Sequence, residues 1–393
     1  MGKSLKLFGL FVLLVSLRLS AAKAQYPTDS ASIYLMTATP GEELYSAWGH
    51  SAIRVSSPSI GYDIIYNYGT FDFSTPNFYT KFTFGRLLYF LSKTSFEDFT
   101  YEYRMTGQGL YQQKLNLTNK EKWQLVNKLE TNHLPENRYY RYDFFRDNCA
   151  TRIRDIVEKS VDGKIVYDAT FIKKPESFRQ LLEESLVSSP WTAFGMDLMM
   201  GKGADSIAGL RDYMFLPAHY KSLYLNAKIV SNGGSHFLAE APVQLLPVVL
   251  ELPKPNKVTS PAFICWFAFL IVLGCSIWGY KKNRHAQWFD IILFSITGII
   301  GLLLLALALE TWHSVMLKNM NIVWLNPLNV IVATSLLLKK QPNWHRKLMF
   351  ALGILIAMFI PVSFIFQQQI PAAAYALMGV LVVRVVKMVV KSA

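Results

Sequence analysis

Five long apolar stretches in the last third of the chain constrain its fold more than any other feature. Each has 18 to 23 residues, enough for a helix to cross the ~30 Å hydrocarbon core of a bilayer. The stretches are residues 261–280, 287–309, 321–338, 348–366 and 372–390. We therefore predict an all-α domain of five transmembrane helices over residues 261–390.

The charges of the connecting loops predict how these helices cross the membrane. Ten lysines and arginines follow the first and third stretches or lie at the C-terminal end of the chain, whereas the only basic residue of the two opposite loops is Lys318. Basic loops stay in the cytoplasm, so the first helix should begin on the outer side. The same ten residues account for most of the net charge of +13, and no basic tract remains that would indicate nucleic-acid binding.

The N-terminus has the pattern of a secretory signal peptide, which we assign to residues 1–24. Lys3 and Lys6 precede a short apolar run, and Ala22-Lys23-Ala24 is a small-x-small cleavage site. An uncleaved N-terminal anchor is the alternative, and Arg18, beside the apolar run, is the residue that favours it. Both the signal peptide and the loop charges place the following residues outside the cytoplasm.

Residues 25–255 are predicted to form a compact exported α+β domain. Alternating apolar and polar residues predict strands over residues 33–36, 51–56 and 62–68. Thr118-Asn119-Lys120-Glu121 is a capping-box pattern that should begin a helix. Trp191, Phe194, Met196 and residues 198–200 are interpreted as core residues, with a membrane-facing lip as the alternative.

Cys149 is the only cysteine of the exported domain, because Cys265 and Cys275 lie in the first membrane stretch. Asp147-Asn148 can cap a helix that starts at Cys149, where unpaired N–H groups and the helix dipole favour a thiolate. The arrangement suits a catalytic nucleophile. A buried structural cysteine at a helix start is the competing interpretation.

His50 and Asn67 are the candidate partners of Cys149. His50 begins a predicted strand directly after Gly49, and Asn67 lies on the next strand. Histidine can act as general base to a thiol, and asparagine can orient the imidazole. Asp63 is the second choice as the orienting residue, and His50 could instead be a structural histidine.

Polar residues near the predicted outer ends of the second and third membrane stretches could bind a lipid. We predict that His313 and Asn321, together with Arg54 of the exported domain, bind the substrate. Interfacial anchoring is the alternative for His313 and Asn321. The spacing of Asp197, Asp205 and Asp212 is irregular, so we expect no metal and no other cofactor.

The order of these residues resembles the circularly permuted NlpC/P60 enzymes, which include lecithin retinol acyltransferase. The shared features are a His-x-Ala-Ile strand, a following Gly-Tyr turn and a later Asn-Cys helix start. The resemblance implies a permuted papain-like α+β fold. It also implies that the cysteine takes an acyl chain from a phospholipid as a thioester, and Asn67 as third residue depends on this analogy.

A second resemblance, to the Lnb family of the Bacteroidota, covers nearly the whole chain. It is carried by WGHSAIRV, YNYGTFDF, RDNCATRIRD, Thr311-Trp312-His313 and NIVWLNPL. That family joins a periplasmic domain to a five-helix membrane domain, and its activity is lipoprotein N-acylation. The resemblance implies Cys149 as nucleophile, His50 as base, a phospholipid donor and a diacylated lipoprotein acceptor. The expected location is the inner membrane, with the N-terminal domain in the periplasm.

Two other functions remain open from the sequence. A membrane-anchored cell-wall cysteine peptidase of the NlpC/P60 type would use the same cysteine and histidine, although one membrane anchor would suffice for it. Acidic or amide-binding side chains around a groove would favour the peptidase, whereas an apolar groove facing the bilayer would favour the acyltransferase. A non-enzymatic tethered binding protein would need neither Cys149 nor His50.

Overall fold

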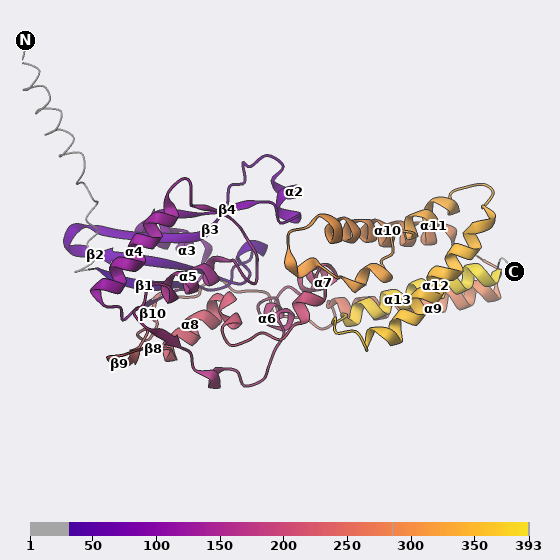
Figure 1. Ribbon diagram of the computed structural model, residues 1–393. Coiled ribbons are helices and arrows are strands. Elements are labelled where there is room, and N and C mark those ends of the chain that lie inside the picture. Colours follow the sequence, from indigo (N-terminus) through magenta and orange to yellow (C-terminus); the bar gives the residue numbers. More distant parts are fainter. Residues whose placement is uncertain (1–30, 285, 392–393) are drawn as a thin grey trace, which may run out of the picture.

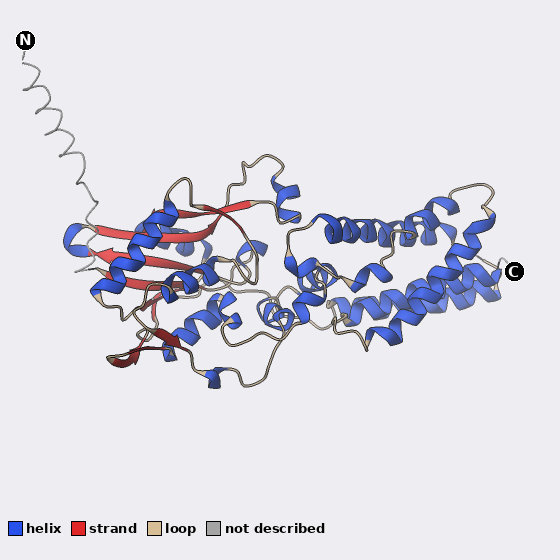
Figure 2. Cartoon of the chain, viewed as in Figure 1, coloured by secondary structure: helices blue, strands red, loops and turns tan. Residues whose placement is uncertain are grey.

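The computed structural model describes residues 31–284 and 286–391. An α+β part with a large sheet occupies one end of an elongated molecule, and a bundle of long helices occupies the other (Figures 1 and 2). This is the division that the apolar stretches predict. The predicted signal peptide, residues 1–24, lies outside the described residues.

The described part of the α+β domain contains an antiparallel sheet of seven strands and a small sheet of three. In spatial order, the strands of the large sheet are β10 (Val243–Leu246), β5 (Leu110–Lys114), β1 (Ser32–Ala38), β2 (His50–Ser57), β3 (Tyr62–Thr70), β4 (Leu88–Ser95) and β6 (Tyr139–Arg141). The small sheet consists of β7 (Lys164–Val166), β8 (Lys228–Ser231) and β9 (Gly234–Phe237). The three strands predicted at the N-terminal end are confirmed as β1, β2 and β3.

Helices cover both faces of the large sheet. The main apolar core lies between one face and α4 (Asn119–His133), α5 (Cys149–Glu158) and α8 (Pro217–Asn226). The other face packs against α3 (Phe96–Thr106). Because side chains alternate along a strand, Ile53 and Val55 enter the main core while Ala52 faces α3. The predicted capping box is confirmed at α4, where Glu121 N donates to Thr118 Oγ1 and Thr118 N donates to Glu121 Oε2.

Three short helices lie between the sheet and the membrane bundle. One is α2 (Phe78–Thr83), in the connection between β3 and β4, and the others are α6 (Phe178–Ser185) and α7 (Pro190–Met199), which precede the bundle in the chain. Short 3₁₀ turns are η1 (Leu44–Ser46), η2 (Pro58–Ile60), η3 (Ala169–Phe171), η4 (Lys202–Asp205) and η5 (Asp212–Phe215).

The bundle contains four described helices that are long and apolar enough to cross a membrane, rather than the predicted five. They are α9 (Pro261–Lys281), α10 (Gln287–Glu310), α12 (Asn343–Ser363) and α13 (Ala372–Lys391). The prediction of one continuous helix over residues 321–338 is wrong. This stretch forms the 3₁₀ turn η7 (Met320–Val323) and the eight-residue helix α11 (Asn329–Leu336), after a further turn, η6 (Ser314–Met316), that follows α10.

The break before α11 has a local cause. Pro327 lacks an N–H group, and Asn326 Oδ1 instead accepts a hydrogen bond from Leu328 N at 3.0 Å. A helix of eight residues is only ~12 Å long, well short of the hydrocarbon core. The broken stretch packs closely on α10, because a Cβ at Gly301 would lie only 2.1 Å from Leu325 O. At the far end Leu336 O accepts from Gln287, so the stretch reaches the level where α10 begins.

Candidate active site

The N-terminus of α5 presents Cys149 at its first position. Asn148 Oδ1 accepts from Thr151 N at 2.9 Å, and Thr151 Oγ1 accepts from Asn148 N at 2.8 Å, a reciprocal cap. The Asn148 amide also donates to Phe215 O at 2.8 Å. The helix therefore starts at the predicted residue, and its first turn is fixed to the surrounding core.

The start of β2 positions His50. Gly49 precedes it with φ 76°, and a Cβ there would lie 2.5 Å from Ala38 O, so the close strand approach requires glycine. His50 Nε2 lies 2.5 Å from Asn67 Oδ1. An amide oxygen only accepts hydrogen bonds, so Nε2 is the donor and Nδ1 remains for the thiol. The two predicted neighbours on adjacent strands are thus in contact.

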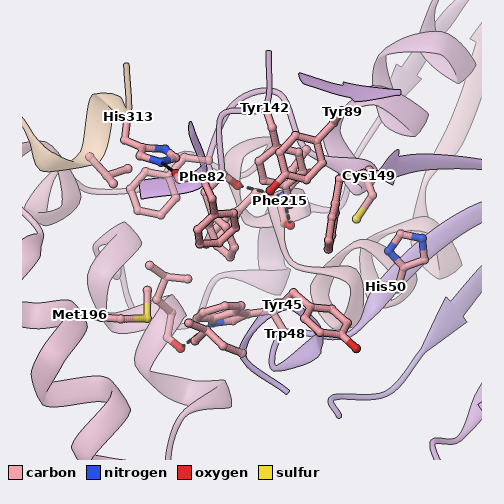
Figure 3. Close-up of a pocket in the computed structure, with 18 of the residues that line it drawn as sticks. Tyr45, Trp48, His50, Phe82, Tyr89, Tyr142, Cys149, Met196, Phe215 and His313 are labelled. Atoms are coloured by element: carbon pink, nitrogen blue, oxygen red, sulfur yellow. Dashed lines mark hydrogen bonds between the residues drawn. The ribbon is translucent and has the colours of Figure 1, made fainter. Parts of the chain in front are cut away.

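Cys149 and His50 meet beside Gly69, near the end of β3. A Cβ at Gly69 would lie 3.5 Å from Cys149 Cβ and 3.8 Å from His50 Cε1. Gly69 has φ 91°, which favours glycine as well. The three sequence segments singled out above therefore converge on one point, with Cys149 and His50 facing each other (Figure 3).

Electrostatics favour an ion pair between Cys149 and His50. Burial raises the pKa of the Cys149 thiol, but the charge and hydrogen bond of His50 and the N–H groups of Ser51 and Ala150 together bring that pKa below its ordinary value. Burial lowers the pKa of His50, yet the charge and hydrogen bond of Cys149 and the hydrogen bond of Asn67 raise it above its ordinary value. These opposite shifts favour thiolate and imidazolium, the form of a reactive cysteine.

A cavity of about 210 Å³ begins at this pair. Its walls are mainly apolar and rich in aromatic side chains, among them Trp48, Phe71, Tyr89, Tyr142, Phe144 and Phe215. Figure 3 shows Cys149 and His50 at one end and Met196 and His313 at the other. The cavity can therefore hold an apolar chain whose reactive end lies at the thiol.

The far end of the cavity is made by the junction with the membrane bundle. Met196, Met199 and Met200 come from α7 and its end, whereas Val315 and Met316 come from the turn that follows α10. Phe194, Leu198 and Met199 of α7 also pack against the apolar core of the bundle. From the sequence, Met196 and residues 198–200 are interpreted as core residues, with a membrane-facing lip as the alternative. In the structure Met196, Met199 and Met200 line the cavity, which is closer to that alternative.

The three predicted substrate-binding residues occupy different environments. His313 lines the cavity, and its Nε2 lies 3.0 Å from Phe82 O. Arg54 instead forms a bidentate pair with Asp63 at 2.7 Å and stacks on Phe96. The structure therefore brings His313, but not Arg54, to the cavity, and it gives Asp63 a partner other than His50.

Asn321 is fully buried at the junction. Its amide donates to Asp197 O and Leu198 O, both at 3.2 Å, and Asn319 donates to Leu198 O at 2.7 Å and Met199 O at 2.9 Å. The last carbonyls of α7 have no partner within their own helix, so these two amides satisfy them. In this position Asn321 joins α7 to the bundle rather than lining the cavity.

Asp197 and Asp205 bind a buried arginine. Arg179, whose side chain is fully buried, donates to Asp205 Oδ1 at 2.7 Å and to Asp197 Oδ1 at 2.9 Å. Within the described residues no group of three or more histidine, cysteine or acidic side chains is arranged to hold a metal ion. The aspartates that drew attention in the sequence therefore have a structural partner.

The sequence patterns did not reveal the cavity. Tyr142, Phe144 and Phe145 continue the aromatic run that begins at Tyr139, and such a run favours a strand. However, β6 ends at Arg141, and these three residues lie in the loop that follows it and line the cavity beside Cys149. Val315 and Met316 lie in a turn between membrane segments. Their clustering with Cys149 depends on tertiary contacts that no local spacing encodes.

Comparison with known proteins supplies the family. Residues 18–184 match the Lnb N-terminal periplasmic domain, and residues 253–393 match the Lnb transmembrane domain. No curated protein and no solved structure matches the chain. The two matches together cover most of the sequence, in the order and with the division seen in the fold. The chain belongs to the Lnb family, with a periplasmic N-terminal domain and a multi-span transmembrane domain.

Proposed function

We propose that this protein is an apolipoprotein N-acyltransferase. It takes an acyl chain from a phospholipid, holds it as a thioester on Cys149, and passes it to the α-amine of the N-terminal cysteine of a diacylated lipoprotein. The observation that carries the proposal is the apolar cavity that joins Cys149 to the outer end of the membrane bundle. Donor and acceptor are both anchored in the membrane, so a site that reaches the junction with the membrane bundle suits them.

In the first half-reaction the Cys149 thiolate attacks the carbonyl carbon of a phospholipid ester. The bond between that carbon and the glycerol oxygen breaks, and the leaving alkoxide takes the proton of the His50 imidazolium. A lysophospholipid departs and a thioester remains. The N–H groups of Ser51 and Ala150, which hydrogen-bond the thiolate, lie where they can also donate to the developing oxyanion.

In the second half-reaction the lipoprotein amine attacks the thioester carbonyl. His50, now neutral, accepts a proton from the amine, the carbon–sulfur bond breaks, and the Cys149 thiolate is restored. The product is an amide, so the transfer from thioester to amine is downhill. Asn67, through Nε2 of His50, keeps the imidazole oriented in both steps.

The cavity wall favours this function over a cell-wall peptidase. A peptide substrate would require donors and acceptors along a groove, whereas the cavity is lined mainly by aromatic and methionine side chains. The lowered pKa of Cys149 and its contact with His50 likewise favour an enzyme over a tethered binding protein.

Mass spectrometry of a lipoprotein's N-terminal peptide tests the proposal. Cells lacking this protein, or carrying Cys149→Ala, should yield a peptide short of one acyl chain, and Cys275→Ser should behave like wild type because Cys275 lies in α9. The same peptide with its full set of acyl chains in the Cys149→Ala cells would refute the proposal. Altered peptidoglycan fragments in those cells would instead support the peptidase.

A further inference from the structure

The connection between β3 and β4 carries exposed aromatic residues that the proposed chemistry does not use. We propose that this connection, the α2 segment (residues 71–87), lies in the outer leaflet of the membrane and binds the phospholipid that enters the cavity. The role in delivering the acyl donor rests on the function proposed above. The contact with the outer leaflet does not.

The α2 segment exposes large apolar side chains in a part of the chain that would otherwise face water. Phe73 is 63% exposed and Tyr79 is 79% exposed. Phe73 is held by ring contacts to Phe71 at 5.0 Å and to Phe78 at 4.8 Å, so it belongs to an ordered aromatic stack. Ordered, exposed aromatic patches are typical of binding surfaces, and tyrosine and tryptophan favour the interface between membrane and water.

Contacts with the end of α10 fix the height of the α2 segment relative to the bilayer. Trp312 N donates to Phe84 O at 3.0 Å, and Arg86 Nη2 donates to Glu310 O at 3.1 Å. Glu310 is the last residue of α10, a helix that is long enough to cross the membrane. The segment therefore lies level with the outer end of a membrane helix, as Figure 1 shows for α2 and α10.

A basic side chain at this level suits a lipid phosphate group. The Arg141 guanidinium stacks on Trp312 with its centre 3.8 Å from the ring, whereas Arg86, 5.7 Å from the same ring, forms an ion pair with the Glu310 carboxylate. Among the described residues the Arg141 side chain has no hydrogen-bond or ion-pair partner, so its guanidinium N–H groups remain open to an anion. Exposed arginine beside interfacial tryptophan matches the polar layer of an outer leaflet.

The α2 segment is also continuous with the cavity. Phe71 and Phe82 line it, and His313, bound to Phe82 O, lines it from the membrane side. A phospholipid held at the segment would thus have its acyl chains beside an apolar path to Cys149. This continuity, together with the height and the charge, favours a lipid over a protein partner on the exposed aromatic residues.

Photo-crosslinking tests the contact. The full-length protein with benzoylphenylalanine at position 79 would be placed in vesicles of phosphatidylethanolamine and phosphatidylglycerol, with position 101 as the matched control. Tyr101 is 59% exposed but lies on α3, which packs on the face of the sheet opposite to the main core. Irradiation should attach phospholipid at position 79 and not at 101. Equal labelling at both positions, no lipid at 79, or attachment only to protein would overturn the proposal.

A kinetic comparison tests delivery. Phe73→Ser combined with Tyr79→Ser should slow acylation of Cys149 by vesicle phospholipid roughly tenfold, as expected when the binding of two exposed aromatic side chains to lipid is lost. Acylation by a soluble short-chain nitrophenyl ester should stay unchanged, and Tyr101→Ser should affect neither. Wild-type rates from vesicles in the double variant would refute delivery. Lipid labelling at position 79 without any acyl group on wild-type Cys149 would leave the leaflet contact standing and refute the acyltransferase.

Discussion

Asn67 Oδ1 lies 2.5 Å from Nε2 of His50 and thereby determines which ring nitrogen faces Cys149. Because the amide oxygen can only accept, Nε2 carries a proton in both charge states of the ring. In the proposed mechanism the nitrogen that exchanges a proton with substrate is then Nδ1, and Asn67 is a positioning residue whose effect passes through His50.

Replacing Asn67 with alanine should slow acylation of Cys149 roughly 10- to 100-fold. The reason is that the imidazole of His50 would lose its fixed orientation, and with it a part of the rate gain that a positioned general base provides. The His50 pKa should fall, since the Asn67 hydrogen bond is one of the causes that raise it. Pre-steady-state acylation measured across pH would report both effects. The control is Asn132→Ala, which removes a hydrogen bond from α4 to Tyr68, the neighbour of Asn67 on β3. This variant should retain the wild-type pH profile. An unchanged profile in Asn67→Ala would remove its positioning role.

The reactivity of Cys149 should persist at pH values below the ordinary range of a cysteine. Its lowered pKa gives Cys149 a larger thiolate fraction at pH 7 than an ordinary cysteine has, so its alkylation by iodoacetamide at pH 7 should be faster than that of an ordinary cysteine. His50→Ala removes the charge and the hydrogen bond that lower the Cys149 pKa, while burial, which raises that pKa, remains. The variant should therefore be alkylated at pH 7 at least about tenfold more slowly. Peptide mapping would measure the rate, with Cys275 as internal control. A His50→Ala rate equal to wild type at pH 7 would contradict the ion pair.

Filling the membrane end of the cavity should change which acyl chains the enzyme accepts. Met196→Trp adds volume at the end opposite Cys149, so donors with shorter chains should gain over longer ones. Competition between two phospholipids of different chain length, read as the mass of the acyl group on Cys149, would measure the preference. Met105→Trp, on an exposed position of α3, should leave it unchanged. The same chain preference in both variants would mean that the acyl chain lies elsewhere.

Gly201 should tolerate no side chain. A Cβ there would lie 2.0 Å from Leu317 O, across the junction between the two domains. Gly201→Ala should cost about 1–3 kcal/mol and lower the melting temperature in detergent. Gly195 lies within α7 with no neighbour within 4 Å of a Cβ, so Gly195→Ala should be neutral or stabilise by about 0.5–1 kcal/mol. Equal melting temperatures for the two variants would show that the junction relaxes easily.

Asn321 offers a choice between two roles. As the group that satisfies the α7 carbonyls and accepts from Trp324 Nε1 at 3.0 Å, it should contribute to stability, and Asn321→Ala should cost about 1–3 kcal/mol. The KM for phospholipid should then stay near wild type. Asn256→Ala, in the exposed linker, is the control for melting. A raised KM at an unchanged melting temperature would restore the sequence-based hypothesis of a lipid-binding Asn321.

Local patterns predicted the parts of the structure that local interactions determine. The caps of α4 and α5 depend on residues three apart, and both helices begin where the capping residues indicate. The strands that carry His50 and Asn67 follow from alternation. Their contact could be anticipated because adjacent antiparallel strands bring residues on one face together.

Hydropathy counts apolar residues, so it did not distinguish a continuous helix from the broken stretch, because the local cause of the break, Pro327, carries no weight in such a count. Non-local packing explains the rest of what the sequence did not reveal. Arg54 looked available on a polar strand face, but Asp63 on the neighbouring strand pairs with it. The cavity could not be predicted because its walls come from three segments that are distant in the sequence: the loop after β6, the helix α7 and the turn after α10.

The broken stretch before α11 also bears on how the chain enters the membrane. Irregular backbone is tolerated at hydrocarbon depth only where protein shields its polar groups from lipid. Here Trp324 and Leu325 are buried against neighbouring helices, and Gly301 of α10 admits the Leu325 carbonyl. We therefore expect that the stretch does not enter lipid in this conformation as an independent segment. It should reach its final conformation only once α10 is in place, so that for this region membrane insertion and tertiary folding are coupled.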